Sequence, residues 1–230
     1  NALADCNKAL SLDSNLSKAY DNRAAVYERQ HEYKKEIADC DLAIKANPYD
    51  ANAYDSRGYA LVELGMPQKA MEQFDKATSI DAHYWHPYFS RGCLYEKEKR
   101  YQDAIRELGK AIDLNPAAAA LYDHRGFAYG QLGKFQNEVE DYSNAIKTDP
   151  KNALFYLNRA FAYGKLGQYA KSLDDANKAI ELDPKSARAY ASRGFAYANL
   201  GKNENAIADY NTTEGRTKCC PVLCRPGLAV

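Results

Sequence analysis

The sequence repeats itself every 34 residues, and this period constrains the fold more than any other feature. A tyrosine recurs without exception at Tyr20, Tyr54, Tyr88, Tyr122, Tyr156 and Tyr190. Three residues after each tyrosine comes an arginine: Arg23, Arg57, Arg91, Arg125, Arg159 and Arg193. The residue after each arginine is small: Ala24, Gly58, Gly92, Gly126, Ala160 and Gly194. A period of this length predicts a solenoid, in which each unit packs on its neighbours.

Each unit contains two stretches of helical character. In the second unit the first stretch runs from about Ala53 to Leu64, and Gly65 follows as a left-handed cap. The second stretch runs from about Gln68 to Ile80. Glycines repeat the first stop at Gly133, Gly167 and Gly201, and prolines prevent continuation of the second helix at Pro48, Pro116, Pro150 and Pro184. The small residue beside each arginine predicts a close approach of two helices.

Segments such as AYDSRGYALVELG and AIRELGKAIDLNP carry the tyrosine, the small residue, a second aromatic or apolar residue, a central alanine and a closing proline. In these features the sequence resembles the tetratricopeptide repeat family, from residue 1 to about residue 212. The resemblance implies an all-α fold, a right-handed α-solenoid of antiparallel helix pairs. The implied units span 17–50, 51–84, 85–118, 119–152 and 153–186, with a partial unit at 187–212. Residues 1–14 resemble the second helix of a preceding unit.

Some positions depart from this pattern. Ala82 replaces the closing proline, and Pro67 stands where other units have an aromatic residue. Glu36, Glu138 and Ser172 stand where other units carry Ala70, Ala104 and Ala206. We expect these departures to alter local packing and to leave the fold intact.

The arginine column predicts an ion pair inside each unit. Sixteen residues after each arginine comes an acid, at Asp39, Glu107, Asp141, Asp175 and Asp209, with Gln73 as the exception. An unpaired buried charge is costly, which favours pairing between the two helices of a unit. The alternative is that each guanidinium reaches water over its apolar stem. Either arrangement makes the column structural.

The resemblance also implies a concave groove that holds a peptide or protein segment. When each unit is numbered from 1, so that Tyr20 has position 4, the groove is lined by positions 2, 5, 9, 12 and 13 of the first helix. The candidate groove residues are Asp21, Asp55, Tyr59, Phe89, Asp123, Phe127, Leu154, Leu157, Asn158, Phe161 and Phe195. This set predicts an acidic groove in the early units and an aromatic groove in the later ones. Alternatively, the aromatic residues at position 9 are buried against the next unit.

Family members that hold chaperone C-termini grip a carboxylate with Lys and Asn on adjacent first helices. Asn22 and Asn158 match such positions, but the lysines are missing, since Asp21, Tyr59 and Phe89 stand in this region. We therefore predict that this chain is not a carboxylate-clamp co-chaperone.

Composition argues against several classes of function. Lys plus Arg equals Asp plus Glu, 31 against 31, whereas a nucleic-acid module or a protein held electrostatically to a membrane carries a basic excess. No apolar run has the length of a membrane span. Catalytic motifs are missing, so we predict no enzyme activity and no cofactor. His83 and His86 lie three residues apart, but we interpret them as parts of a boundary loop and predict no metal site. Cys6 and Cys40 fall on helix faces that look buried, which favours a reducing, cytoplasmic location.

From Thr213 onward the repeat stops. Codons for residues 217–228 can be chosen so that a shifted reading frame encodes proline, tyrosine, arginine and glycine. If two bases were lost upstream, these four would fall 34 residues after Pro184, Tyr190, Arg193 and Gly194. We therefore interpret 213–230 as a seventh repeat read out of frame and expect it to be disordered. In that case Cys219, Cys220 and Cys224 have no selected function. The sequence also begins without Met, so we expect a piece of a longer protein.

These observations predict a non-catalytic scaffold that binds a protein or peptide segment in the groove of a repeat solenoid. Two other classes also fit the sequence. One is an accessory or regulatory solenoid of a larger enzyme, and the other is an assembly module that self-associates through its uncapped ends.

Overall fold

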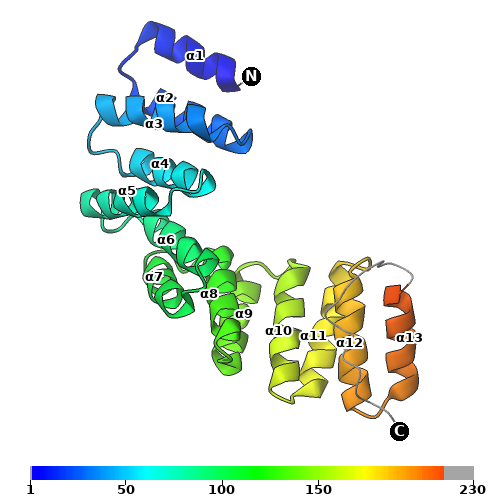
Figure 1. Ribbon diagram of the computed structural model, residues 1–230. Coiled ribbons are helices and arrows are strands. Elements are labelled where there is room, and N and C mark those ends of the chain that lie inside the picture. The colour runs from blue at the N-terminus through cyan, green and yellow to red at the C-terminus, as the bar shows by residue number, and fades with distance from the viewer. Residues whose placement is uncertain (1, 215–230) are drawn as a thin grey trace. The chain divides into compact units, whose positions relative to one another are not determined.

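We analysed a computed structural model of the chain, which describes residues 2–214 (Figure 1). These residues form helices joined by short turns, and they contain no strand. The first eight helices are α1 (Ala2–Leu12), α2 (Ser17–Arg29), α3 (Tyr33–Ala46), α4 (Ala51–Glu63), α5 (Pro67–Ile80), α6 (His86–Lys97), α7 (Tyr101–Leu114) and α8 (Ala119–Gln131). The remaining helices are α9 (Phe135–Thr148), α10 (Ala153–Lys165), α11 (Tyr169–Leu182), α12 (Ala187–Asn199) and α13 (Asn203–Glu214).

The expected all-α repeat solenoid is confirmed. The helices alternate with the 34-residue period, and α1 occupies the segment expected to be a lone second helix. The predicted out-of-frame tail lies outside the described residues, apart from Thr213 and Glu214, which belong to α13. Among the helices of residues 2–214, none combines the length and the apolar character that crossing a bilayer requires.

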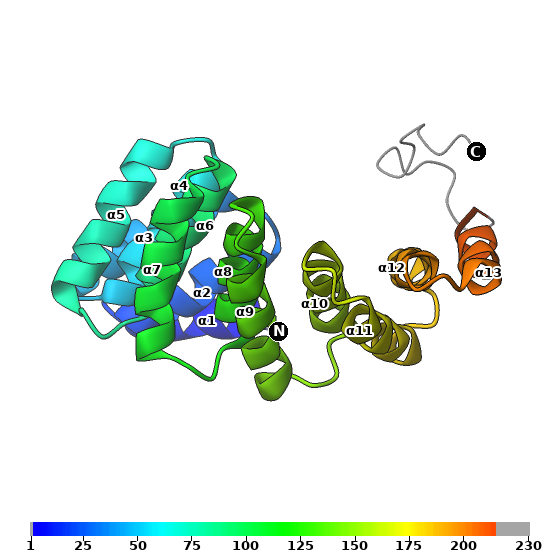
Figure 2. The same ribbon diagram turned by 90° about the horizontal axis from the view of Figure 1, so that it is seen from below.

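The chain also divides into two compact parts, which we call the N-terminal part (residues 1–128) and the C-terminal part (residues 129–230), and the boundary lies inside α8. Within the N-terminal part, α2 packs on α3, α4 on α5 and α6 on α7. Within the C-terminal part, α10 packs on α11 and α12 on α13 (Figure 2). First helices of successive pairs also touch, since α2 contacts α4, α4 contacts α6 and α10 contacts α12. In each part the first helices therefore share one continuous surface.

Every first helix ends in the left-handed backbone conformation that the sequence predicts at Gly65. The φ angle of Gly65 is 74°, its N–H donates to Val62 O at 3.0 Å, and the N–H of Met66 donates to Leu61 O at 2.9 Å. Gly133, Gly167 and Gly201 repeat the positive φ. His31 and Lys99 hold the same conformation without being glycine, with φ of 56° and 60°. The turn geometry is therefore a property of the repeat, and these two residues adopt it against their own preference.

The two helices of a pair approach most closely at the small residue beside the arginine. A Cβ atom added at Gly58 would lie 2.4 Å from Phe74, one at Gly92 would lie 2.7 Å from Leu108, and one at Gly194 would lie 2.8 Å from Tyr210. Two other units show the compensating choice. Where the small residue is Ala24 or Ala160, the residue sixteen positions later is Cys40 or Ala176. Each pair thus fills the same space with glycine plus a large residue, or alanine plus a small one.

The departures from the repeat pattern leave the helices in place, as expected. Pro67 becomes the first residue of α5, where a missing N–H costs nothing. Although Ala82 replaces the closing proline, α5 still ends at Ile80. The hydroxyl of Ser172 donates to Ala160 O at 2.7 Å and so satisfies a buried polar group.

Candidate partner-binding surface

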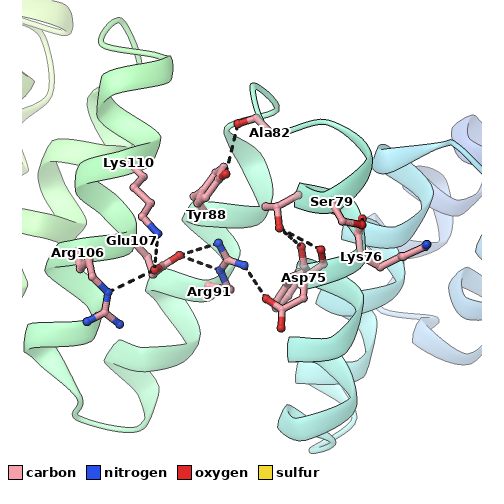
Figure 3. Close-up of polar contacts among 11 residues, drawn as sticks. Asp75, Lys76, Ser79, Ala82, Tyr88, Arg91, Arg106, Glu107 and Lys110 are labelled. Carbon is pink, nitrogen blue, oxygen red and sulfur yellow. Dashed lines mark hydrogen bonds and ion pairs between the residues drawn. The ribbon is translucent and has the colours of Figure 1, made fainter.

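The predicted arginine–acid pair forms between the helices of one unit. In the best buried example, Arg91 Nε donates to Glu107 Oε2 at 2.8 Å, and Nη2 of the same arginine lies 2.7 Å from that oxygen (Figure 3). Arg23–Asp39, Arg159–Asp175 and Arg193–Asp209 pair in the same way, at 2.6, 2.7 and 2.7 Å. At the exception, Arg57 donates to the amide oxygen of Gln73. The arginines are therefore held by acceptors of their own unit.

A second contact of the arginine, which the sequence did not predict, joins neighbouring units of the repeat. Arg91 Nη1 donates to Asp75 Oδ1 of the preceding second helix, α5, at 2.7 Å, so the guanidinium lies between α5 and α7 (Figure 3). The same contact joins Arg23 to Asn7, Arg57 to Asp41, Arg159 to Ser143 and Arg193 to Asn177. A polar residue sixteen positions before the arginine was the available signal. This use as a structural tie leaves the arginine column with little capacity to bind a partner.

We call the outward positions 2, 5, 9, 12 and 13 of the first helices the first-helix face. Its exposed apolar side chains are Tyr59, Phe127, Leu154, Phe161 and Phe195, with 39, 44, 54, 55 and 45% of their surface accessible. Four of these five hold position 9. Phe89 and Asp123, at position 5, are half-buried, and so is Asn158, a candidate groove residue at the neighbouring position 6. The exposed part of the face therefore combines aromatic side chains with charged ones, among them Arg29, Glu63, Lys97 and Lys165.

Three of the candidate groove residues lie beneath this surface. Leu157 is buried and packs with Ala179 and Ala189 in the core. Asp55 is buried and accepts a hydrogen bond from Ser90 at 3.0 Å, while burial raises its pKa to about 7. Asp21 is also buried, and burial followed by the nearby charge of Asp50 raises its pKa to about 6. These positions face the adjacent first helix, which removes them from water.

The aromatic residues at position 9 combine the two arrangements left open by the sequence. Each ring is about half exposed, and the rings of Tyr59, Phe127 and Phe195 also contact the tyrosine that begins the preceding second helix. The ring centroids of Tyr59 and Tyr33 are 6.5 Å apart, those of Phe127 and Tyr101 are 6.3 Å apart, and those of Phe195 and Tyr169 are 6.1 Å apart. The contact is with the preceding unit rather than with the next one, and it fixes the rings while leaving a face open.

Acidic side chains surround the aromatic pair at the start of the face. Burial, and then the charges of Glu63 and Glu28, raise the pKa of Tyr59 to about 12. Glu63 is partly neutralised by Lys97, whose Nζ lies 2.6 Å from its carboxylate. Glu28 and Glu63, at positions 12 and 13, are therefore the acidic groups of the face near this pair, because Asp21 and Asp55 are buried. Exposed basic residues also lie at position 13, at Arg29 and Lys97.

In the C-terminal part, the first-helix face carries more exposed apolar residues, at Leu154, Phe161 and Phe195. Lys165 Nζ lies 5.1 Å from the centre of the Phe161 ring, and Phe195 packs over the backbone of Gly164. Beside the Tyr169–Phe195 contact, an open pocket of 370 Å³ is lined by Gly167, Gln168, Tyr169, Ala170, Lys171 and Leu200. Such half-exposed rings beside a hollow resemble the apolar centre of a protein-binding surface.

Two carboxylates lie buried where other units have alanine. Glu36 has no exposed surface, and neither of its carboxylate oxygens receives a hydrogen bond from the described residues. Burial, then Glu28 and Glu63, raise the pKa of Glu36 to about 8. Burial alone raises the pKa of Glu138 to about 7, and its carboxyl group lies against Gly130, where a Cβ would come within 2.7 Å. Both groups belong to the packing between helices.

A polar cluster on the first-helix face was also not predicted from the sequence. Cys93 and Glu96 of α6 meet His124 of α8, with 3.8 Å between Cys93 Sγ and His124 Nδ1 and 2.7 Å between that nitrogen and Glu96 Oε2. The Cys93 and Glu96 contacts together raise the pKa of His124 to about 10. Phe89 places its ring edge against the imidazole at 5.1 Å. The available signal was Cys93 itself, which holds position 9 in place of an aromatic residue.

The His83–His86 segment connects α5 to α6. His86 stacks on Trp85 at 3.7 Å between ring centroids, and burial lowers its pKa. His86 is the first residue of α6, so only His83 lies in the connecting loop. Among residues 2–214, the group of three possible metal ligands within reach of one another is Cys93, Glu96 and His124, which contains neither His83 nor His86.

Comparison with known proteins identifies the repeat. Tetratricopeptide repeat models match residues 51–84, 85–118, 153–186 and 176–208, and a further TPR repeat model matches 131–167. The search of curated proteins finds no match.

Several solved structures share the fold. PilF of Pseudomonas aeruginosa is 17% identical over 84% of this chain and 88% of its own, with a TM-score of 0.74. The MamA protein is 23% identical over 72% of this chain and 91% of its own, with a TM-score of 0.68. YrrB, described as a TPR protein with an unusual peptide-binding site, is 22% identical over 80% and 95%, with a TM-score of 0.62. With five repeat models matched along its length, the chain belongs to the tetratricopeptide repeat family.

Proposed function

We propose that this chain is a non-catalytic scaffold that binds a protein or peptide segment along the first-helix face. The observation that carries the proposal is the half-exposed aromatic ring at position 9, repeated at Tyr59, Phe127, Phe161 and Phe195. Rings that are held at one edge and open on the other lose little side-chain entropy on binding, and aromatic residues dominate protein interfaces. The peptide-binding site named for YrrB is consistent with this use of the fold.

The charges of the face suggest the chemistry of the partner. Glu28 and Glu63 favour basic residues of the partner near Tyr59. In the C-terminal part, Leu154, Phe161 and Phe195 favour apolar side chains of the partner. We therefore infer an extended or helical segment with apolar side chains and some basic residues. The carboxylates with raised pKa, such as Asp55 and Glu138, lie inside the packing, which supports a binding role rather than a catalytic one.

A selection from a displayed library of random peptides tests this function and does not require the natural partner. Selected peptides are expected to be enriched in apolar and basic residues. Their affinity, measured by fluorescence anisotropy, should fall at least about tenfold when Phe127, Phe161 and Phe195 are all changed to Ser. Tyr49→Ser is the matched control, since this tyrosine is 81% exposed in the turn between α3 and α4.

Circular dichroism of each variant checks that the helices remain folded. Peptides that bind the triple variant and the wild-type chain equally well would contradict the proposed surface. Light scattering of the same samples tests the alternative of an assembly module, because self-association makes the measured mass rise with concentration.

A further inference from the structure

Three side chains of types that bind metal ions lie close together in the N-terminal part: Cys93, Glu96 and His124. Cys93 and Glu96 are three residues apart on α6, so they project from the same side of the helix, and His124 approaches from α8. One ligand atom from each residue lies within 4.8 Å of the other two. Two different helices therefore supply a compact S, N and O donor set.

The donor types and their spacing fit a tetrahedral zinc ion. Zinc binds thiolate at about 2.3 Å and imidazole at about 2.0 Å, which places the two ligand atoms about 3.6 Å apart. The observed separation of Cys93 Sγ and His124 Nδ1 is 3.8 Å. The Glu96 Oε2 to His124 Nδ1 separation of 2.7 Å is a hydrogen bond, and it must lengthen by about 0.6 Å when both atoms bind the same ion.

The second oxygen of Glu96 is an independent sign of an incomplete site. Glu96 Oε1 is buried and receives no hydrogen bond from the described residues, although a buried carboxylate oxygen without a partner is costly. A cation at the cluster supplies this missing interaction. The side chain of His124 is 37% exposed and that of Glu96 is 10% exposed, so an ion has a path from solvent to the donors.

We propose that Cys93, Glu96 and His124 form a Zn²⁺ site with an open fourth position. Thiolate and imidazole together select zinc over magnesium or calcium, which prefer oxygen ligands. Three protein ligands plus water is the pattern of a zinc site that accepts an external ligand. Cys93 and Glu96 hold positions 9 and 12, so two of the three ligands belong to the first-helix face. Metal binding is independent of the proposed peptide binding, and the two fail separately.

Co²⁺ titration followed by absorbance tests the site directly. The full chain is used with Cys219→Ser, Cys220→Ser and Cys224→Ser, so that the three tail cysteines contribute no signal. We expect one Co²⁺ per chain, with a near-ultraviolet charge-transfer band from the thiolate and visible bands of a tetrahedral ion. Addition of Zn²⁺ should displace the cobalt and remove both sets of bands.

Variants of the three residues assign the ligands. Cys93→Ser should abolish the charge-transfer band, and His124→Gln and Glu96→Gln should each weaken Co²⁺ binding at least about tenfold. His83→Gln is the matched control, an exposed histidine outside the cluster, and should bind as the parent protein does. The proposal is overturned if the parent protein shows no charge-transfer band, or if the band survives Cys93→Ser. Because Glu96→Gln and His124→Gln alter different helices, they keep the test decisive should Cys93→Ser fail to fold.

Discussion

At the scale of single residues, this repeat tolerates exceptions when a neighbour compensates for them. Gly58 faces Phe74, whereas Ala24 corresponds to Cys40 sixteen residues later, so the volume between the two helices is kept. Glu36 is an exception without such compensation, because its carboxyl group replaces a methyl group in a closed space and has no hydrogen-bonding partner among the described residues. Such a group lowers stability whenever it is ionised.

Glu36 therefore makes the stability of the N-terminal part depend on pH. Its pKa is raised to about 8, above the ordinary value of 4.5 that applies when the chain is unfolded. The folded state binds the extra proton, so its contribution is full below pH 4.5 and is lost as the pH rises through 8. Urea unfolding should show Glu36→Gln to be more stable than wild type by about 1–3 kcal/mol at pH 8, with the difference shrinking toward pH 5.

The control for this measurement is Glu140→Gln, at an exposed position of α9. Its effect on the free energy of unfolding should be small, because its side chain is exposed. An equal gain for Glu36→Gln at pH 5 and pH 8 would show that removal of charge is not the cause.

At the scale of helices and turns, each pair is closed by a left-handed residue and tied to its neighbours by an arginine. The tie places one guanidinium between acceptors of two second helices, as for Arg91 between Asp75 and Glu107. The cost of taking these charges out of water offsets much of their attraction, so a tie adds little net stability, whereas removal of one member alone leaves a buried charge and is destabilising. The turn, in contrast, has a simple energetic cost wherever the residue is not glycine.

Lys99 and Gly65 offer a reciprocal test of that cost. Lys99→Gly should stabilise the chain by about 1 kcal/mol, because φ of 60° is unfavourable for a residue with a side chain. Gly65→Lys should destabilise it by a similar amount. A Cβ atom at Gly65 meets no atom within 4 Å, so the effect is conformational rather than steric.

Thermal or urea unfolding of both variants measures the two shifts. Changes of the same sign in the two variants would contradict the assignment of the cost to backbone conformation.

At the scale of the whole molecule, the chain consists of two compact parts, and within each part a helix contacts mainly its neighbours in sequence. Stability in such a chain is a sum of local terms and nearest-neighbour terms, so damage remains local. The first-helix face has a similar division, with charged and aromatic residues in the N-terminal part and more exposed apolar residues in the C-terminal part.

Gly58→Ala tests this locality. The added methyl group would lie 2.4 Å from Phe74, and relief of the clash should cost about 1–3 kcal/mol. Hydrogen exchange measured by mass spectrometry should speed up in α4, α5 and the adjacent helices, and should stay unchanged in α10–α13. Faster exchange throughout the chain would contradict the nearest-neighbour picture. Ala189→Gly, at a buried position of α12, is the reciprocal control and should speed up exchange in the C-terminal part only.

The sequence by itself determined the helices, their stops and the pairing of arginine with the acid sixteen residues later. These features are local: each lies within one 34-residue unit, and the columns shared by six copies fix its register. Gly65, Arg91 and Glu107 behave as their columns predict. The aromatic positions of the first-helix face were also predictable, because position 9 repeats.

Only the tertiary structure decided which of the candidate residues reach the surface and which residues of different units meet. Asp21 and Asp55 share the helical face of exposed residues but lie buried, since the adjacent first helix covers them. Cys93 and His124 are 31 residues apart, and no period within one unit brings them together. The physical reason is that a helical period fixes the direction of a side chain, while its exposure and its contacts depend on how closely the next helix packs.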